Sequence, residues 1–196
     1  MKPVLYLTGA PATGKSTLSR ELAKACPSLK VFAYSEQLRE HIKLRNGAQP
    51  LDAQEIRAKS SQVVMPDDIA QVDLKLVEFV ANNRCANPVL IDSHAVTKES
   101  YGFRVTGFAP ESLKGINPTA ILCMYATGQT LVERIAEKSE GRPAVDVFEA
   151  QMHCQLQASL AIQYGFALGR PVYLLDGALA IEELVEHVSR RARLRE

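Results

Sequence analysis

Short apolar runs alternate with longer amphipathic or polar segments along this chain. Such runs are typical of parallel strands that are buried on both faces. We expect strands at residues 4–7, 31–34, 88–91, 119–125 and 171–175. The segments between them predict helices at about residues 17–25, 36–45, 52–64, 66–85, 130–138, 146–168 and 181–193.

Residues that prefer helix ends support several of these boundaries. Ser35 is expected to cap the second helix. Asp146 and Glu149 stand three positions apart before an apolar segment, which is the pattern of a capping box. Residues 93–118 are rich in Gly, Pro and Thr, so we expect irregular structure there.

The alternation of strands and helices predicts an α/β fold in one domain. A chain of 196 residues suits a single core, and its strands would form a parallel sheet with helices on both faces. Ligands of such sheets lie outside the carboxyl ends of the strands. The residues that follow the strands are therefore candidates: Thr8-Gly9, Ser35, Asp92-Ser93-His94, Ala126-Thr127 and Asp176-Gly177.

A glycine-containing loop follows the first expected strand. It fits G-x-x-x-x-G-K-[ST], with Thr17 directly after it, and reads Gly9-Ala10-Pro11-Ala12-Thr13-Gly14-Lys15-Ser16. The backbone N–H groups of such a loop point at phosphate oxygens, and the next helix presents its positive end to them. Lys15 can reach the outer phosphates, and Ser16 offers a hydroxyl to Mg²⁺. The motif stands between a strand and a helix, so we expect it to bind ATP and Mg²⁺.

An acidic residue ends the third expected strand. Asp92 follows an apolar run at the ligand edge of the sheet, where a carboxylate can hold magnesium directly or through water. A turn or helix-capping role is the alternative. His94 is a candidate contact to nucleotide or substrate, and a hydrogen-bonded structural histidine is the other interpretation.

Two arginines flank a break between helices at residues 138–143. Arg134 and Arg142 could close over the transferring phosphate, since the guanidinium fork binds phosphate with two hydrogen bonds. A kinase needs such a lid to exclude water from its nucleotide. Alternatively, Arg134 faces solvent and pairs with Glu133 or Glu137.

Three further arginines are candidates for binding the acceptor. Arg39, Arg57 and Arg104 lie between the second and fourth strands, and solvated surface arginines are the alternative. Arg104 stands in an aromatic stretch, residues 101–108. The aromatic side chains there could hold a base or sugar, or they could fill the core beneath the loop.

Composition limits the partners. The chain has 23 Lys and Arg against 22 Asp and Glu, so its net charge of +1 gives no sign of a nucleic-acid partner. The apolar run at the N-terminus is too short for a signal peptide or a membrane span. Four scattered cysteines without a CxxC pair favour a reduced, cytoplasmic compartment, and Cys123 is expected to be buried.

These motifs resemble a known family. The opening GAPATGKST resembles P-loop nucleoside monophosphate kinases, which are AAA-type ATP-binding proteins in the wider sense. The segment Leu90-Ile91-Asp92-Ser93-His94-Ala95 resembles archaeal-type adenylate kinases, which usually carry Thr at the place of Ser93. Looser matches are Tyr34 to Leu38, Glu55-Ile56-Arg57, Glu133-Arg134-Ile135 and Gly141-Arg142.

The resemblance implies a P-loop NTPase fold of three layers, α/β/α, with five parallel strands in the order 2-3-1-4-5. It implies an acceptor-binding helical region at about residues 35–86, with Ser35 near its start, and a short lid at about residues 138–147. ATP would be the donor and a nucleoside monophosphate the acceptor. The chain would be a possible homo-oligomer.

The same resemblance assigns roles to single residues. Lys15, Arg134 and Arg142 would stabilise charge during transfer, and Arg57 would bind the acceptor's phosphate. The segment Asp176-Gly177-Ala178 would lie at the donor adenine.

Two departures from the family leave the acceptor open. The Gly-Pro-Gly-rich loop of archaeal-type adenylate kinases is replaced by residues 101–108, and the lid has fewer Arg and Asp residues. A kinase of another small molecule and an ATP-binding regulatory module without an acceptor are therefore the alternatives. A GTPase switch is disfavoured because the sequence has no Asn-Lys-x-Asp motif.

Overall fold

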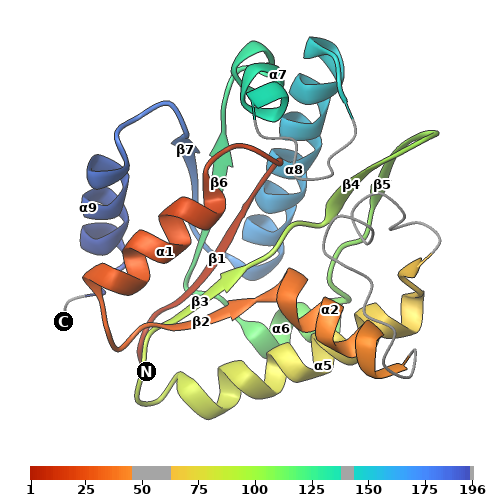
Figure 1. Ribbon diagram of the computed structural model, residues 1–196. Coiled ribbons are helices and arrows are strands. Elements are labelled where there is room, and N and C mark those ends of the chain that lie inside the picture. The colour runs from red at the N-terminus through yellow and green to blue at the C-terminus, as the bar shows by residue number, and fades with distance from the viewer. Residues whose placement is uncertain (46–62, 138–143, 195–196) are drawn as a thin grey trace.

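The computed structural model describes residues 1–45, 63–137 and 144–194. A central sheet is covered by helices on both faces, so the molecule has three layers (Figure 1). The helix expected at 52–64 falls almost entirely outside the described residues, as do Arg57 and Arg142.

The sheet has five strands, all parallel. Their order is β2-β3-β1-β6-β7, which is the expected order once the fourth and fifth predicted strands are numbered β6 and β7. The strands are β1 (Val4–Gly9), β2 (Lys30–Ala33), β3 (Val89–Asp92), β6 (Ala120–Tyr125) and β7 (Val172–Asp176). The first strand is fully buried because it lies in the middle of the sheet.

Alternate residues of β1 face the two helical layers. Leu5 and Leu7 pack towards α1 (Lys15–Ala25) and α9 (Ile181–Arg191). Val4 and Tyr6 face the opposite layer, which contains α5 (Pro66–Asn83), α6 (Pro110–Ile116) and α8 (Val147–Leu168). Because successive side chains of β1 point to opposite faces of the sheet, this strand contributes to both halves of the core.

Two helices stand beside the carboxyl ends of the strands. They are α2 (Tyr34–Arg45), which follows β2, and α7 (Gly128–Glu137), which follows β6. Both begin earlier than expected, as does α1. Ser35 therefore lies in the first turn of α2 and is not its cap.

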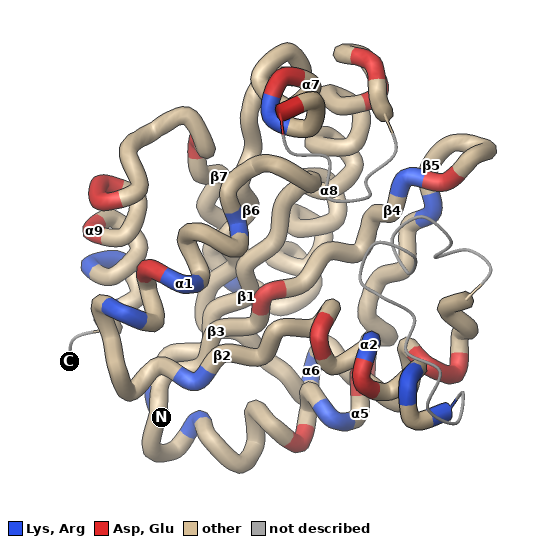
Figure 2. The backbone as a smooth tube through the Cα atoms, in the orientation of Figure 1, with Lys and Arg blue, Asp and Glu red and all other residues tan. Residues whose placement is uncertain are grey.

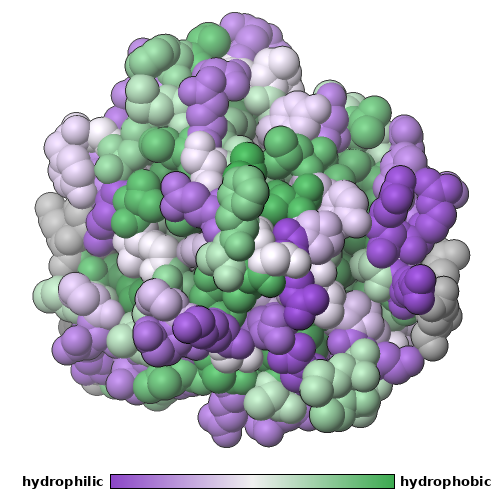
Figure 3. All heavy atoms as spheres, turned by 180° about the vertical axis from the view of Figure 1, so that it is seen from behind, coloured by the Kyte–Doolittle hydropathy of each residue, from purple (hydrophilic) through white to green (hydrophobic). Residues whose placement is uncertain are grey.

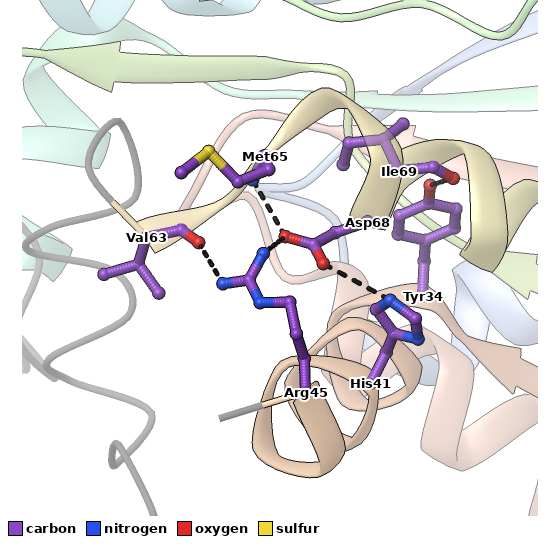
Figure 4. A network of polar contacts seen from close by, with 7 residues as sticks. All are labelled: Tyr34, His41, Arg45, Val63, Met65, Asp68 and Ile69. Atoms are coloured by element: carbon purple, nitrogen blue, oxygen red, sulfur yellow. Dashed lines mark hydrogen bonds and ion pairs between the residues drawn. The ribbon is translucent and has the colours of Figure 1, made fainter. Parts of the chain in front are cut away.

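A buried carboxylate fixes α2 against α5. Asp68 accepts a hydrogen bond from the Met65 N–H at 2.9 Å, which caps α5. It also forms an ion pair with Arg45 and lies 3.3 Å from the His41 ring (Figure 4). Because Asp68 is only 1% exposed, its contacts hold the two helices at one angle.

The segment 93–118 is ordered, so the expectation of irregular structure was wrong. It forms an antiparallel hairpin of β4 (Val96–Glu99) and β5 (Gly102–Val105), followed by α6. The hairpin escaped prediction because its strands are four residues long and carry charged residues. Gly102 takes a φ of 135°, a conformation that side chains disfavour, just after the turn.

Polar residues of α8 attach the hairpin to the sheet. Gln157 donates to the Thr8 hydroxyl at 2.6 Å and accepts from the Val96 N–H at 3.2 Å. One turn earlier, His153 contacts the Val96 carbonyl at 3.0 Å. The helix itself begins at Asp146 with the predicted capping box, in which the Asp146 carboxylate accepts from the Glu149 N–H at 2.7 Å.

The surface and the cysteines agree with an ordinary globular chain. Apolar and polar residues intermingle over the face seen from behind (Figure 3). All four cysteines are free, and Cys123 is buried as expected. Among the described residues, no helix is long and apolar enough to cross a membrane.

We expect Gln157→Leu to lower the free energy of unfolding by about 2 kcal/mol, because it leaves the buried Val96 N–H without its partner. Urea denaturation measures the loss. Gln155→Leu, the same change at an exposed position of α8, is the matched control and should alter stability little. An equal effect of the two changes would contradict the role given to Gln157.

Candidate functional site

A continuous cavity of about 980 Å³ opens at the carboxyl ends of the strands. Its wall combines the loop after β1 with parts of α2, α5, the β4–β5 hairpin and α8. The volume lies at the upper end of the usual range for small-molecule sites, about 300–1,000 Å³. It is large enough for two ligands side by side.

Residues 9–16 form a tight loop whose backbone lines this cavity. Gly9 has a φ of 151°, and a Cβ at this position would lie 2.6 Å from the Met124 carbonyl oxygen of β6. Gly14 has a φ of 99° and stands directly before α1. Only glycine suits these two positions, and α1 consequently directs its N-terminal N–H groups into the cavity. The loop is therefore built to bind an anion.

Lys15 and Asp92 meet beside this loop. The Lys15 ammonium lies 3.5 Å from a carboxylate oxygen of Asp92, and both side chains are largely buried, at 13% and 15% exposure. They meet because β1 and β3 are neighbours, with Leu7 paired to Asp92. Ser16 lines the cavity from the first turn of α1.

The oxygen atoms of Ser16 and Asp92 fit magnesium. Mg²⁺ prefers oxygen ligands and is commonly held by one or two protein groups together with water and phosphate oxygens. No cluster of three or more His, Cys, Asp or Glu able to hold a metal occurs within residues 1–45, 63–137 and 144–194.

The loop after β7 lies against the phosphate loop. A Cβ on Gly177 would clash with the Thr13 carbonyl oxygen, and the Gly177 N–H donates to the Tyr125 carbonyl at 2.7 Å. Asp176 accepts from the Ala178 N–H at 2.9 Å and so shapes the turn. Gly177 itself lines the cavity.

Arg134 joins these two loops. Its guanidinium donates to the Ala12 carbonyl at 3.2 Å and to the Gly177 carbonyl at 3.0 Å. The alternative of a solvent-facing arginine paired with Glu133 or Glu137 was wrong. Arg134 is partly buried at the cavity wall.

The charged residues of the hairpin are paired with each other and with α8. Arg104 lies 3.1 Å from Glu99, and Lys98 lies 2.9 Å from Glu149. Figure 2 shows basic and acidic positions close together on β4 and β5. Arg104 and Lys98 line the cavity, as does the exposed His94, but these ion pairs limit the positive charge offered to a ligand.

On the opposite wall lie Tyr6, Tyr164 and Asp73, which the sequence analysis did not single out, beside Tyr34 and Phe108 from segments that it named. An aromatic wall, formed by Tyr6, Tyr34, Phe108 and Tyr164, has ring centroids 5.6–6.2 Å apart. Beside it lies Asp73, which is only 5% exposed and accepts a hydrogen bond from the Tyr34 hydroxyl at 2.7 Å. Burial raises the pKa of Asp73 above its ordinary value. The available signal was an acid on the apolar face of the helix expected at 66–85.

A family model described as AAA domain matches residues 8–151, which is most of the chain. The chain belongs to this AAA-domain family. No curated protein matches the sequence at a significant level.

Solved structures share the fold of this AAA-domain chain. A sugar kinase from Janibacter sp. is 14% identical, with 99% of this chain and 96% of that chain covered and a TM-score of 0.57. A gluconokinase from Sinorhizobium meliloti is 14% identical, with 97% and 94% covered and a TM-score of 0.56. A shikimate kinase from Acinetobacter baumannii, in complex with shikimate, is 14% identical, with 100% and 96% covered and a TM-score of 0.57. At such low identity the likeness establishes the fold alone.

The predicted site residues of this AAA-domain protein divide into three groups. The structure gathers the loop residues, Lys15 and Gly177 around the cavity, with Asp92 paired to Lys15. From the expected acceptor side, Ser35, Arg39, His94 and Arg104 also line it. Arg134 lines the cavity as well, whereas Asp176 and Ala178 flank Gly177 and are not among its lining residues. Arg57 and Arg142 lie outside the described residues.

We expect Gly177→Ala in the AAA-domain protein to weaken Mg·ATP binding about ten- to hundredfold, because the new methyl group pushes on the Thr13 carbonyl. Calorimetric titration with Mg·ATP measures the change. Ala81→Ser, at an exposed position of α5 that does not line the cavity, should leave the affinity unaltered. Unchanged binding in Gly177→Ala would show that the two loops do not need this close approach.

His153 should make the stability depend on pH. Its burial lowers the pKa of the imidazole, and the charges of Lys15 and Lys98 act in the same direction. The unfolded chain therefore binds a proton near the ordinary pKa of 6.5 while the folded chain does not. The stabilising effect is complete above this pH and is lost as the pH falls below it, by at most about 1.4 kcal/mol per pH unit.

Chemical denaturation between about pH 5 and 7.5 tests this, since the span brackets the pKa of a free histidine. We expect His153→Gln to flatten the decline in stability towards acid pH. His187→Gln, at an exposed histidine, is the control and should keep the wild-type slope. Equal slopes in wild type and His153→Gln would refute the assignment.

Proposed function

We propose that this chain transfers a phosphoryl group from Mg·ATP to a small acceptor that binds in the same cavity. The observation that carries the proposal is the continuity of the cavity. It joins the phosphate loop, next to the Lys15–Asp92 pair, to a wall of α2, α5 and hairpin residues. A donor and an acceptor can therefore meet without leaving the protein.

The donor side is proposed to act mainly by positioning and electrostatics. The backbone N–H groups of residues 9–17, apart from Pro11, would hold the phosphates of ATP, and Asp176 to Ala178 would lie near the adenine. Bound Mg²⁺ would be held by Ser16 and Asp92 and would offset phosphate charge. Lys15 would exchange its contact with Asp92 for one with the transferring phosphate.

The arginines are proposed to have different tasks. Arg134 bridges two loop carbonyls, so it would keep the phosphate loop and the loop after β7 in register while its charge faces the phosphates. Arg142 would close with the lid at residues 138–147 and exclude water from the reaction. No side-chain nucleophile is required, since the acceptor's own oxygen attacks.

A nucleoside monophosphate is the first candidate acceptor. The resemblance to archaeal-type adenylate kinases supports it, and the aromatic wall offers rings against which a base can pack. Within the helical region at residues 35–86, Ser35, Arg39 and Arg57 would bind the acceptor, together with His94 and Arg104 from the following segment.

A different small metabolite is the second candidate. The solved structures that share the fold over almost their whole length include proteins named as sugar, gluconate and shikimate kinases. The ion pairing of Arg104 and Lys98 also limits the charge available for an acceptor phosphate. Hydroxyl-bearing compounds therefore belong in the same screen.

An assay of ADP release with Mg·ATP tests the proposal, using AMP, CMP, GMP, UMP, shikimate and gluconate one at a time. We expect one of them to raise ADP formation above the rate without acceptor. Lys15→Ala should reduce that activity at least about a hundredfold. Lys24→Ala, an exposed lysine of the same helix, should retain it. Tight Mg·ATP binding with no stimulation by any acceptor would instead favour a regulatory ATP-binding module.

A further inference from the structure

Asp73 is an acidic residue whose side chain is buried among apolar residues. It lies on the face of α5 that packs into the core, beside Val72 and one turn before Leu76, both of which are fully buried. Placing a carboxylate there costs free energy unless hydrogen bonds or charges compensate for the lost water. A carboxylate at this position therefore needs hydrogen-bond donors or a positive charge close to it.

The described residues supply only part of that compensation. One oxygen of Asp73 accepts the hydrogen bond from the Tyr34 hydroxyl. The other makes no hydrogen bond or ion pair with a described residue, although a carboxylate can accept about four hydrogen bonds. Because Asp73 lines the cavity, a ligand in the cavity can reach this oxygen.

A second polar atom on the same wall is also unsatisfied. The Tyr6 hydroxyl is buried and makes no hydrogen bond among the described residues. It lies near the side chains of Thr8 and Ser93, at the end of β1 that faces the cavity. Tyr6 contacts Phe108 and Tyr164 ring to ring, so its hydroxyl belongs to the aromatic wall.

The surroundings define which ligand group fits. A carboxylate can only accept hydrogen bonds, so it selects N–H or O–H groups and repels phosphates and carboxylates. The aromatic wall favours a compact or flat body over a charged one. Tyr34, which points from α2 towards α5 (Figure 4), keeps one Asp73 oxygen occupied and leaves the other for the ligand.

We propose that Asp73, Tyr6 and the aromatic wall form the subsite that recognises the acceptor. The subsite would accept a hydrogen bond from an N–H or O–H group on the uncharged end of the acceptor. This inference rests on the proposed function. The donating group is either the exocyclic amine of a nucleobase or a hydroxyl of a polyol acid. In both cases any anionic group of the acceptor points away from Asp73.

Calorimetry in the presence of Mg·ADP tests the subsite without needing turnover. The probes are AMP and CMP, which offer an amine, and shikimate and gluconate, which offer hydroxyls. We expect at least one of these probes to bind the wild-type protein. The dissociation constant of that probe should rise at least about tenfold in Asp73→Asn. Asparagine keeps an oxygen for Tyr34 but presents an NH₂ group, a donor, to the ligand.

Asp67→Asn, the same change at an exposed position of α5, is the matched control and should leave acceptor affinity unchanged. The affinity of Asp73→Asn for Mg·ADP should equal that of wild type. If Asp73→Asn does not fold, Tyr6→Phe decides the matter, because it removes a hydroxyl that makes no hydrogen bond with the residues that the structure describes. It should keep the melting temperature and weaken the same probe at least about threefold.

The outcomes separate this inference from the proposed function. Binding that depends on Asp73 without phosphoryl transfer would uphold the subsite and reject the kinase reaction. Binding that Asp73→Asn leaves within about twofold, or no binding by any of the four probes, would overturn the subsite even if another acceptor were phosphorylated.

Discussion

The close approach of three backbone segments around the phosphate loop is the constraint on which the rest of the site depends. Gly9 leaves no room for a side chain against the Met124 carbonyl, and Gly177 leaves none against the Thr13 carbonyl. Arg134 then donates hydrogen bonds to the carbonyls of Ala12 and Gly177 at the cavity wall. The loop is thereby held between β6 and the loop after β7. This clamp sets the direction of α1, and with it the positions of Lys15 and Ser16.

Three basic side chains of the site are already paired with acidic ones, so the site suits a ligand that carries both negative charge and a metal cation. Lys15 is paired with Asp92, Arg104 with Glu99 and Lys98 with Glu149. The attraction for phosphate therefore comes largely from oriented N–H groups at the start of α1, which carry partial charge without a titrating side chain. A polyphosphate with its metal ion can satisfy Lys15 and Asp92 at once, by separating two groups that neutralise each other in its absence.

The sequence located the phosphate loop and Asp92 but not Asp73 or the full aromatic wall, for a physical reason. Residues 9–16 are contiguous, and Asp92 ends an apolar strand, so a local pattern reveals both. The aromatic wall combines Tyr6 of β1, Tyr34 of α2, Phe108 from the segment after the hairpin and Tyr164 of α8, with Asp73 from α5 beside it. No local pattern links residues so far apart. The hairpin was missed for a related reason, since its buried residue Glu99 is charged and pairs with Arg104.

This division also explains why family membership and fold leave the acceptor undetermined. The AAA-domain match covers the phosphate loop, and the shared fold places that loop at the edge of the sheet. Structures that are only 14% identical preserve the arrangement although their names refer to sugar, gluconate and shikimate kinases. An acceptor wall drawn from separate elements can change one residue at a time without disturbing the backbone clamp. Under the proposed function, the chemistry of that wall would select the acceptor, and Asp73 and Tyr6 are polar groups there whose hydrogen-bonding capacity the described residues do not fill.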